Sequence, residues 1–276
     1  MIARRRFLAI GGAGLVLAGC APRPRSVAPL EVVERPVTIA TPDGVAQAVL
    51  LHPASGSWPA VLLWPDIRGL RPAFVGLGRT LAQAGYTVLA VNAFYRSAAL
   101  DGSVSPGELT AEQTSERMTA WRAAATDEGI ARDTRAYMAW LDAQPQVAAG
   151  RTAGSLGYNV GGAHAFRAAA ALPERIGAVA SVHGLGVATA RPNSPHLLVG
   201  QTRAAYFVAM ARPDDEREPG DKDDLAKAFA AAGLEGRVMV YPAGHGFAVP
   251  DDSAYDQAAA DLVWAEILAL FAGALG

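Results

Sequence analysis

Cysteine is nearly absent from this sequence: Cys20 is the single one among 276 residues. One cysteine cannot build a disulfide framework or a cysteine-based metal site. Downstream of Cys20, no thiol is available to act as a catalytic nucleophile. His52 and His196 have no partners at metal-ligand spacing, so we expect no metal site and no cofactor.

Excess charge and long apolar runs are also lacking. Charged residues make up 18% of the chain and the formal net charge is −2, which gives no electrostatic basis for binding nucleic acid. No internal repeat or heptad pattern indicates a solenoid or coiled coil. With 51% hydrophobic residues, the chain fits one globular domain with a sizeable core, and nothing indicates a protein partner.

The N-terminus has the pattern of an export signal. Arg4, Arg5 and Arg6 precede an apolar run over 7–18, which is shorter than the about 20 residues of a membrane-spanning helix. The arginines followed by Phe-Leu resemble a twin-arginine signal, and Leu-Ala-Gly-Cys resembles a lipobox in which Cys20 is lipidated. We therefore expect an exported protein anchored by lipid on the periplasmic side of a bacterial membrane; a plain secretory signal is the alternative.

Three segments follow from this pattern: a signal peptide (1–20), a Pro-rich tether (21–30) and one folded domain (31–276). In the domain, apolar runs of strand length alternate with helical patterns, which predicts a mostly parallel sheet with helices on both faces. We expect a loop over 97–109. The expected strands are 37–40, 46–53, 59–66, 86–92, 177–184, 205–211 and 237–243, and the expected helices are 72–85, 110–144, 160–172, 221–232 and 252–274.

One motif has the spacing of a nucleophile elbow. In "GYNVG", Gly157 and Gly161 flank Asn159 at the spacing Gly-x-nucleophile-x-Gly, between an expected strand and helix. The glycines allow the sharp turn that presents the central side chain. Asp214 follows a later strand and His245 follows the last one, so the chain order is that of an α/β-hydrolase triad.

The sequence resembles the dienelactone hydrolase family over nearly all of 31–276. The resemblance is carried by "WPDIRGLRPAF", "AGYTVLAVNAFYR", "GYNVGGAHAFRAAA", "SVHG", "ARPDDEREP" and "YPAGHGF" with "YDQAAADLVWAEI". It implies an α/β-hydrolase fold, no cofactor, and hydrolysis of lactones and small esters by a Cys-His-Asp triad.

The resemblance also assigns roles to individual positions. The family's cysteine falls on Asn159, its histidine on His245, and its aspartate on Asp214, with Asp215 as the alternative. The oxyanion hole falls on the backbone N–H groups of Ile67 and Val160, and pocket positions fall on Asp66, Tyr95 and Arg96. His164 and His183 are interpreted as packing or polar-network residues.

The departure from the family lies at the nucleophile. A carboxamide has no ionisable proton near neutral pH, so His245 cannot activate Asn159 as it activates a thiol. One alternative is a shifted elbow with Ser155 as nucleophile, since "AGSLG" matches Ala-x-Ser-x-Gly. Two functions remain open: an exported hydrolase of small carboxylic esters or lactones, and a catalytically degenerate member that binds such small molecules.

Overall fold

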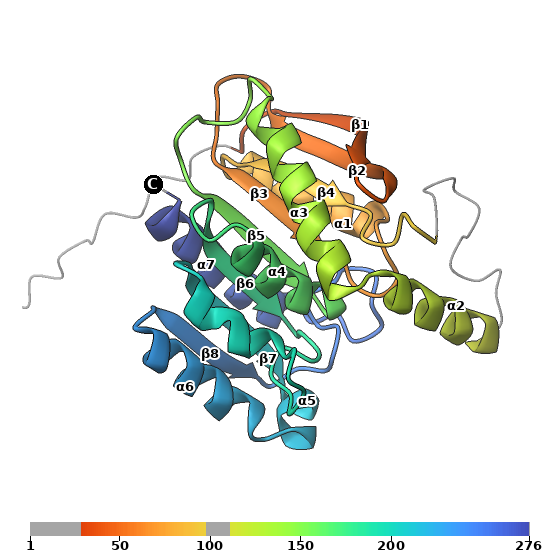
Figure 1. Ribbon diagram of the computed structural model, residues 1–276, viewed down its shortest axis with the longest axis vertical. Helices are drawn as coiled ribbons and strands as arrows, with labels where there is room; N and C mark the ends of the chain where they lie inside the picture. Colours follow the sequence, from red (N-terminus) through yellow and green to blue (C-terminus); the bar gives the residue numbers. More distant parts are fainter. Residues whose placement is uncertain (1–28, 98–110, 276) are drawn as a thin grey trace, which may run out of the picture.

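The computed structural model describes residues 29–97 and 111–275, and an eight-stranded sheet forms their centre (Figure 1). The expected signal peptide, most of the tether and nearly all of the expected loop lie outside these residues. The strands are β1 Val32–Thr41, β2 Gly44–Pro53, β3 Ala60–Trp64, β4 Thr87–Val91, β5 Ala153–Tyr158, β6 Ile176–Val182, β7 Ala205–Ala211 and β8 Gly236–Tyr241.

The strand order is β1-β2-β4-β3-β5-β6-β7-β8. β1 and β2 form the predicted antiparallel hairpin, and β2 also runs antiparallel to β4. All later pairings are parallel. The central strands β3, β4 and β5 are buried at every position, because helices cover both of their faces. The predicted mostly parallel sheet is therefore confirmed.

Helices cover both faces of the sheet (Figure 1). They are α1 Pro72–Gln83, α2 Ala111–Ala124, α3 Asp127–Asp142, α4 Val160–Ala171, α5 Arg212–Arg217, α6 Asp221–Ala232 and α7 Gln257–Ala274, with a 3₁₀ helix, η1, at Pro195–Gln201. Side chains of α3, α4 and α6 pack on one face of the sheet and share one apolar cluster. Side chains of α1 and α7 share a second cluster on the other face.

Two helix predictions need correction. The expected helix over 110–144 is two helices, α2 and α3. The break occurs at Thr126, which is the N-cap of α3: its side chain accepts a hydrogen bond from the Gly129 N–H at 3.1 Å. The final helix begins at Gln257 rather than near 252, because Asp256 caps it by accepting from the Ala259 N–H at 3.0 Å. By length and composition α7 could span a membrane, but one side of it, which carries Val263, Ile267 and Phe271, packs on the sheet.

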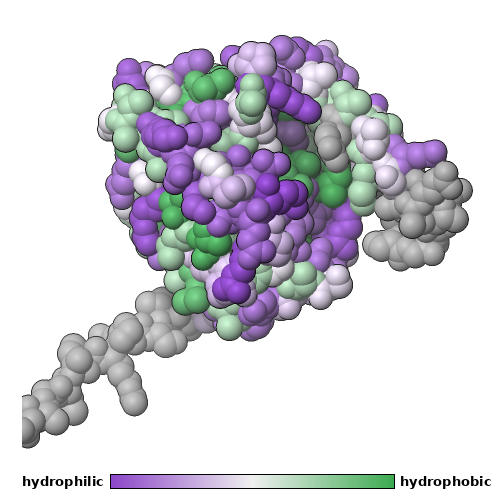
Figure 2. Space-filling model, turned by 90° about the horizontal axis from the view of Figure 1, so that it is seen from below, coloured by the Kyte–Doolittle hydropathy of each residue, from purple (hydrophilic) through white to green (hydrophobic). Residues whose placement is uncertain are grey.

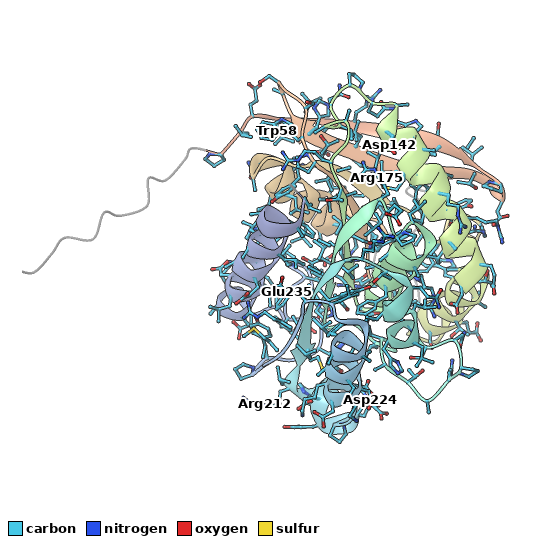
Figure 3. All side chains as sticks on the ribbon, turned by 60° about the vertical axis from the view of Figure 1, so that its left-hand side comes forward. Trp58, Asp142, Arg175, Arg212, Asp224 and Glu235 are labelled. Carbon is cyan, nitrogen blue, oxygen red and sulfur yellow. The ribbon has the colours of Figure 1, made fainter. Side chains whose placement is uncertain are left out.

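The carboxyl ends of the parallel strands meet at one end of the molecule. Figure 3 shows Arg212, which directly follows β7, far from Arg175, which directly precedes β6. Loops at the carboxyl ends of parallel strands form the binding crevice of such sheets. Seen from below in Figure 2, the surface has apolar groups in a recess surrounded by hydrophilic ones.

Candidate active site

A sharp turn joins β5 to α4 and places Asn159 at its apex. Asn159 has φ 53° and ψ −120°, a conformation that non-glycine residues adopt rarely and at a cost. A Cβ atom on Gly157 would overlap the carbonyl of Gly161, and one on Gly161 would overlap the carbonyl of Trp64. Both glycines are thus required by close approach of the backbone. The strand–turn–helix context that the motif predicts is present.

Three side chains, from the β5–α4 turn, from α5 and from the loop after β8, form one hydrogen-bonded chain. The Asn159 side-chain nitrogen Nδ2 lies 2.6 Å from Nε2 of His245, and Nδ1 of His245 lies 2.6 Å from Oδ2 of Asp214. Because an amide nitrogen only donates, Nε2 of His245 accepts and Nδ1–H donates to Asp214. His245 is therefore held as the neutral tautomer with its proton on Nδ1.

Asp214 is the carboxylate of this chain. Its other oxygen, Oδ1, accepts from Arg217 at 2.8 Å, one helical turn further along α5. Burial raises the pKa of the Asp214 carboxyl, but the hydrogen bond from His245 and the hydrogen bond and charge of Arg217 outweigh it and leave the pKa below its ordinary value. Asp215, the alternative acid, is turned to Lys222 instead, at 2.6 Å. The structure thus brings Asp214, rather than Asp215, to His245.

The expected oxyanion-hole residues lie beside Asn159. Ile67, Asn159 and Val160 line one cavity of about 580 Å³. Val160 is the first residue of α4, so its N–H has no acceptor within the helix and points out of the helix N-terminus. The N-terminus of a helix also favours negative charge. This end of the cavity is suited to a carbonyl oxygen that gains negative charge.

Ser155 does not reach His245. It lies inside β5, paired with Leu62 and Val179 of the neighbouring strands, and is fully buried. Its Oγ accepts a hydrogen bond from Nε1 of Trp64 at 3.0 Å. The turn that exposes a side chain occurs four residues later, at Asn159. The shifted-elbow alternative is therefore not supported by the geometry.

The expected pocket residues serve other contacts. The Asp66 carboxylate is held by both terminal nitrogens of Arg71, at 2.7 and 2.9 Å. Tyr95 donates to the buried carboxylate of Asp133 at 2.8 Å, and Arg96 binds both oxygens of that carboxylate at 2.8 Å. None of the three expected residues is among the described residues that line the cavity beside Asn159. Their polar atoms instead tie loops and α3 together.

His183, expected from the sequence to be a packing or polar-network residue, is buried and packs against the site. It has φ 36° and its ring lies edge-on to His245, 5.0 Å between centroids. Burial lowers the pKa of His183 to about 3, so the ring that contacts His245 is uncharged. Sequence reasoning missed Arg217, although a basic residue three positions after an acidic one on a helix is a recognisable pair.

A second cavity adjoins the first. It has a volume of about 850 Å³ and includes His245, Asp214 and Arg217 in its lining. The two cavities share residues of the loop after β6, among them Leu185 and Arg191. The Asn159–His245 hydrogen bond therefore lies at their junction. Among the described residues, no cluster of His, Cys, Asp or Glu has the arrangement of a metal site.

A sequence profile of the dienelactone hydrolase family matches residues 46–275. The chain belongs to the dienelactone hydrolase family. Its α/β-hydrolase fold is confirmed by this match and by the eight-stranded sheet. Among curated proteins, none matches the chain significantly.

Solved structures of dienelactone hydrolases share the fold. The putative dienelactone hydrolase of Klebsiella pneumoniae subsp. pneumoniae MGH 78578 is 21% identical, with a TM-score of 0.75 over 88% of this chain and 99% of that one. A dienelactone hydrolase-like promiscuous phosphotriesterase from metagenomic libraries is 20% identical, with a TM-score of 0.72 over 89% and 99%. The dienelactone hydrolase of Anabaena variabilis ATCC 29413 is 18% identical, with a TM-score of 0.64 over 89% and 99%. At these identities the likeness establishes the fold alone.

Proposed function

We propose that this member of the dienelactone hydrolase family binds small carboxylic esters or lactones beside Asn159 without forming an acyl-enzyme. The observation that carries the proposal is the 2.6 Å hydrogen bond from Asn159 to Nε2 of His245. The amide fits the hydrogen-bonding frame of a triad, yet its nitrogen lone pair is delocalised and His245 cannot make it a nucleophile. The hydrogen bonds of a triad are therefore present, but no acyl-enzyme can form at Asn159.

A carbonyl ligand is favoured by the groups around Asn159. Outward-facing N–H groups at the start of α4 bind a carbonyl oxygen, and the cavity that begins there has apolar walls. Such a site retains affinity for an ester even when no nucleophile is present, because binding and bond cleavage depend on different groups.

The test compares the full chain in mild detergent with Asn159→Cys, using a chromogenic acetate ester and a dienelactone. We expect the unmodified chain to bind both, measured by calorimetry, with no burst of released alcohol. Asn159→Cys should raise hydrolysis by about 10²–10⁴-fold, since removing one member of a triad leaves only residual catalysis. The double variant Asn159→Cys/His245→Ala is the control and should lose that gain. A stoichiometric burst from the unmodified chain would contradict the proposal.

A second candidate is slow hydrolysis by water that His245 directs. It is favoured by the 2.6 Å contact of His245 with the ionised Asp214, which is the pairing of a general base with its orienting carboxylate. Asn159→Ala frees Nε2 of His245 for water. Turnover that persists in Asn159→Ala and disappears in His245→Ala would support this candidate over binding alone.

We further propose that the protein is exported and held by lipid at Cys20, as the N-terminal pattern predicts. Cys20→Ser is the informative variant. It should move the protein from the membrane fraction to the soluble periplasmic fraction without changing ester binding. Unchanged membrane association in Cys20→Ser would argue against a lipid anchor.

A further inference from the structure

One face of α4 forms a wall of the cavity that begins at Asn159. The residues of α4 that line the cavity are Val160, Ala163, His164 and Arg167. They are spaced i, i+3, i+4 and i+7, which places them on one stripe of the helix. At 1.5 Å per residue the stripe extends about 10 Å from the elbow. The cavity, called the channel below, therefore extends along α4 beyond Asn159.

Most of the surface that lines the channel is apolar. Val160 and Ala163 present aliphatic groups, and Ile67, Ala125 and Leu185 line it from other segments. His164 adds no charge, because burial, and to a smaller extent the positive Arg167, lowers its pKa to about 3. Thr126, Thr189, Ser194 and Arg191 also line the channel. Its surface as a whole is nevertheless mostly apolar, which favours an apolar ligand segment.

A neutral ion pair lies at the far end of the channel. Nε of Arg167 lies 2.7 Å from Oδ1 of Asp127, and the Asn193 side chain donates to Oδ2 of Asp127 at 2.7 Å. The Arg167 side chain is only 12% exposed. Since the charges of Arg167 and Asp127 compensate each other, this ion pair adds no net charge to the channel.

The chemistry of the elbow gives the direction in which an ester lies. The carbonyl oxygen binds at the N–H groups at the start of α4, within the channel. In a triad the histidine faces the leaving group, and His245 lines the other cavity. The acyl side of the ester is therefore the part that enters the channel along α4.

We propose that the channel along α4 is an acyl pocket for apolar chains of hexanoyl to octanoyl length, and that Ala163 sets that length. The inference rests on the proposed function, namely that the site binds esters. An extended octanoyl chain spans about the same length as the α4 stripe, roughly 10 Å. Ala163 lies midway between Val160 and Arg167, is 9% exposed, and lines the channel. A larger side chain at position 163 blocks the part of the channel between Ala163 and Arg167.

The test uses 4-nitrophenyl acetate, butyrate, hexanoate and octanoate with the full chain carrying Asn159→Cys, so that binding in the channel is read as kcat/KM. We expect kcat/KM to rise by about 4-fold per added CH₂ up to octanoate. Adding Ala163→Leu should lower octanoate hydrolysis by about 10-fold or more and leave acetate within about 2-fold. Ala269→Leu, on the exposed face of α7, is the matched control and should leave the whole series unchanged.

Thermal unfolding of each variant distinguishes a misfolded protein from a folded one with a blocked channel. Ala163→Val introduces a smaller side chain than leucine and should leave kcat/KM for butyrate unchanged. A flat chain-length series, or an unchanged series in folded Ala163→Leu, would overturn the acyl pocket while leaving ester binding intact. If Asn159→Cys hydrolyses none of the esters and the unmodified chain binds none by calorimetry, the proposed function itself is wrong and the acyl pocket with it.

Discussion

Asn159 donates its side-chain N–H to Nε2 of His245 across 2.6 Å, in the place where a triad has its nucleophile. This bond holds His245 as the tautomer that donates to Asp214. The second polar atom of the amide, Oδ1, is buried and has no hydrogen-bond partner among the described residues. The amide of Asn159 is therefore hydrogen-bonded through its nitrogen but not through its oxygen, and it supplies no nucleophilic atom.

Ser155 is predicted to be a structural residue. In the Asn159→Cys background, Ser155→Ala should leave kcat for a chromogenic ester within about 2-fold, because Ser155 lies inside β5. It should lower the free energy of unfolding by about 1–3 kcal/mol, since the indole N–H of Trp64 loses its acceptor. Kinetics and urea denaturation measure the two effects. Loss of hydrolysis with unchanged stability would reinstate the shifted elbow.

His164 and His183 should make the fold sensitive to acid. Burial lowers both pKa values to about 3, whereas an unfolded histidine has a pKa of about 6.5. Between about pH 6.5 and 3 the unfolded chain binds protons that the folded chain does not. The free energy of unfolding therefore falls with decreasing pH by about 1.4 kcal/mol per pH unit for each histidine.

The variant His164→Phe isolates one of these contributions. Urea denaturation at several pH values between about 4.5 and 6 should show a dependence of the free energy of unfolding on pH that is smaller by about 1.4 kcal/mol per pH unit in the variant. The aromatic ring also keeps an edge contact with Trp64 available. An identical slope in both proteins would mean that His164 is protonated in the folded state.

The two glycines of the elbow should not tolerate a methyl group. A Cβ on Gly161 would overlap the backbone carbonyls of Trp64 and Pro65, so Gly161→Ala should cost about 3 kcal/mol or more, or prevent folding. Gly76 in α1 is the matched control, because a Cβ there meets nothing within 4 Å. Gly76→Ala should raise stability by about 0.5–1 kcal/mol. Thermal unfolding distinguishes the two; similar effects would contradict the close approach.

Arg71 should contribute more to stability than a surface arginine does. Its side chain is 9% exposed and binds Asp66 at 2.7 Å and Asp251 at 2.7 Å, which joins the loop after β3 to the loop that follows His245. Arg71→Met should cost about 3 kcal/mol, because the buried carboxylate of Asp66 loses the guanidinium that binds both of its oxygens. Arg203→Met removes a pair that is 73% and 70% exposed and should cost less than about 1 kcal/mol. An equal loss of free energy of unfolding in the two variants would argue against a stabilising role for the ion pairs of Arg71.

Most of the strands and the elbow could be predicted from local sequence patterns. The apolar runs identified the strands other than β5. The glycine spacing identified the elbow and the strand before it, because Gly157 and Gly161 flank Asn159 at the spacing that such a turn requires. Boundaries were less accurate: α3 and α7 start at the capping residues Thr126 and Asp256, whose roles depend on the local backbone. The pocket roles expected for Tyr95 and Arg96 were not supported, since Asp133, distant in sequence, engages both side chains.

By itself, the sequence determined that the elbow carries Asn159, and hence that no thiol or hydroxyl stands at its apex, because residue identity needs no fold. It also determined the order Asn159, Asp214, His245, and it predicts an export signal. Only the tertiary structure decided that Asp214 rather than Asp215 meets His245, that Ser155 faces Trp64, and that one stripe of α4 lines a channel. These choices depend on how separate strands and helices pack, since packing brings together side chains that are far apart in the chain.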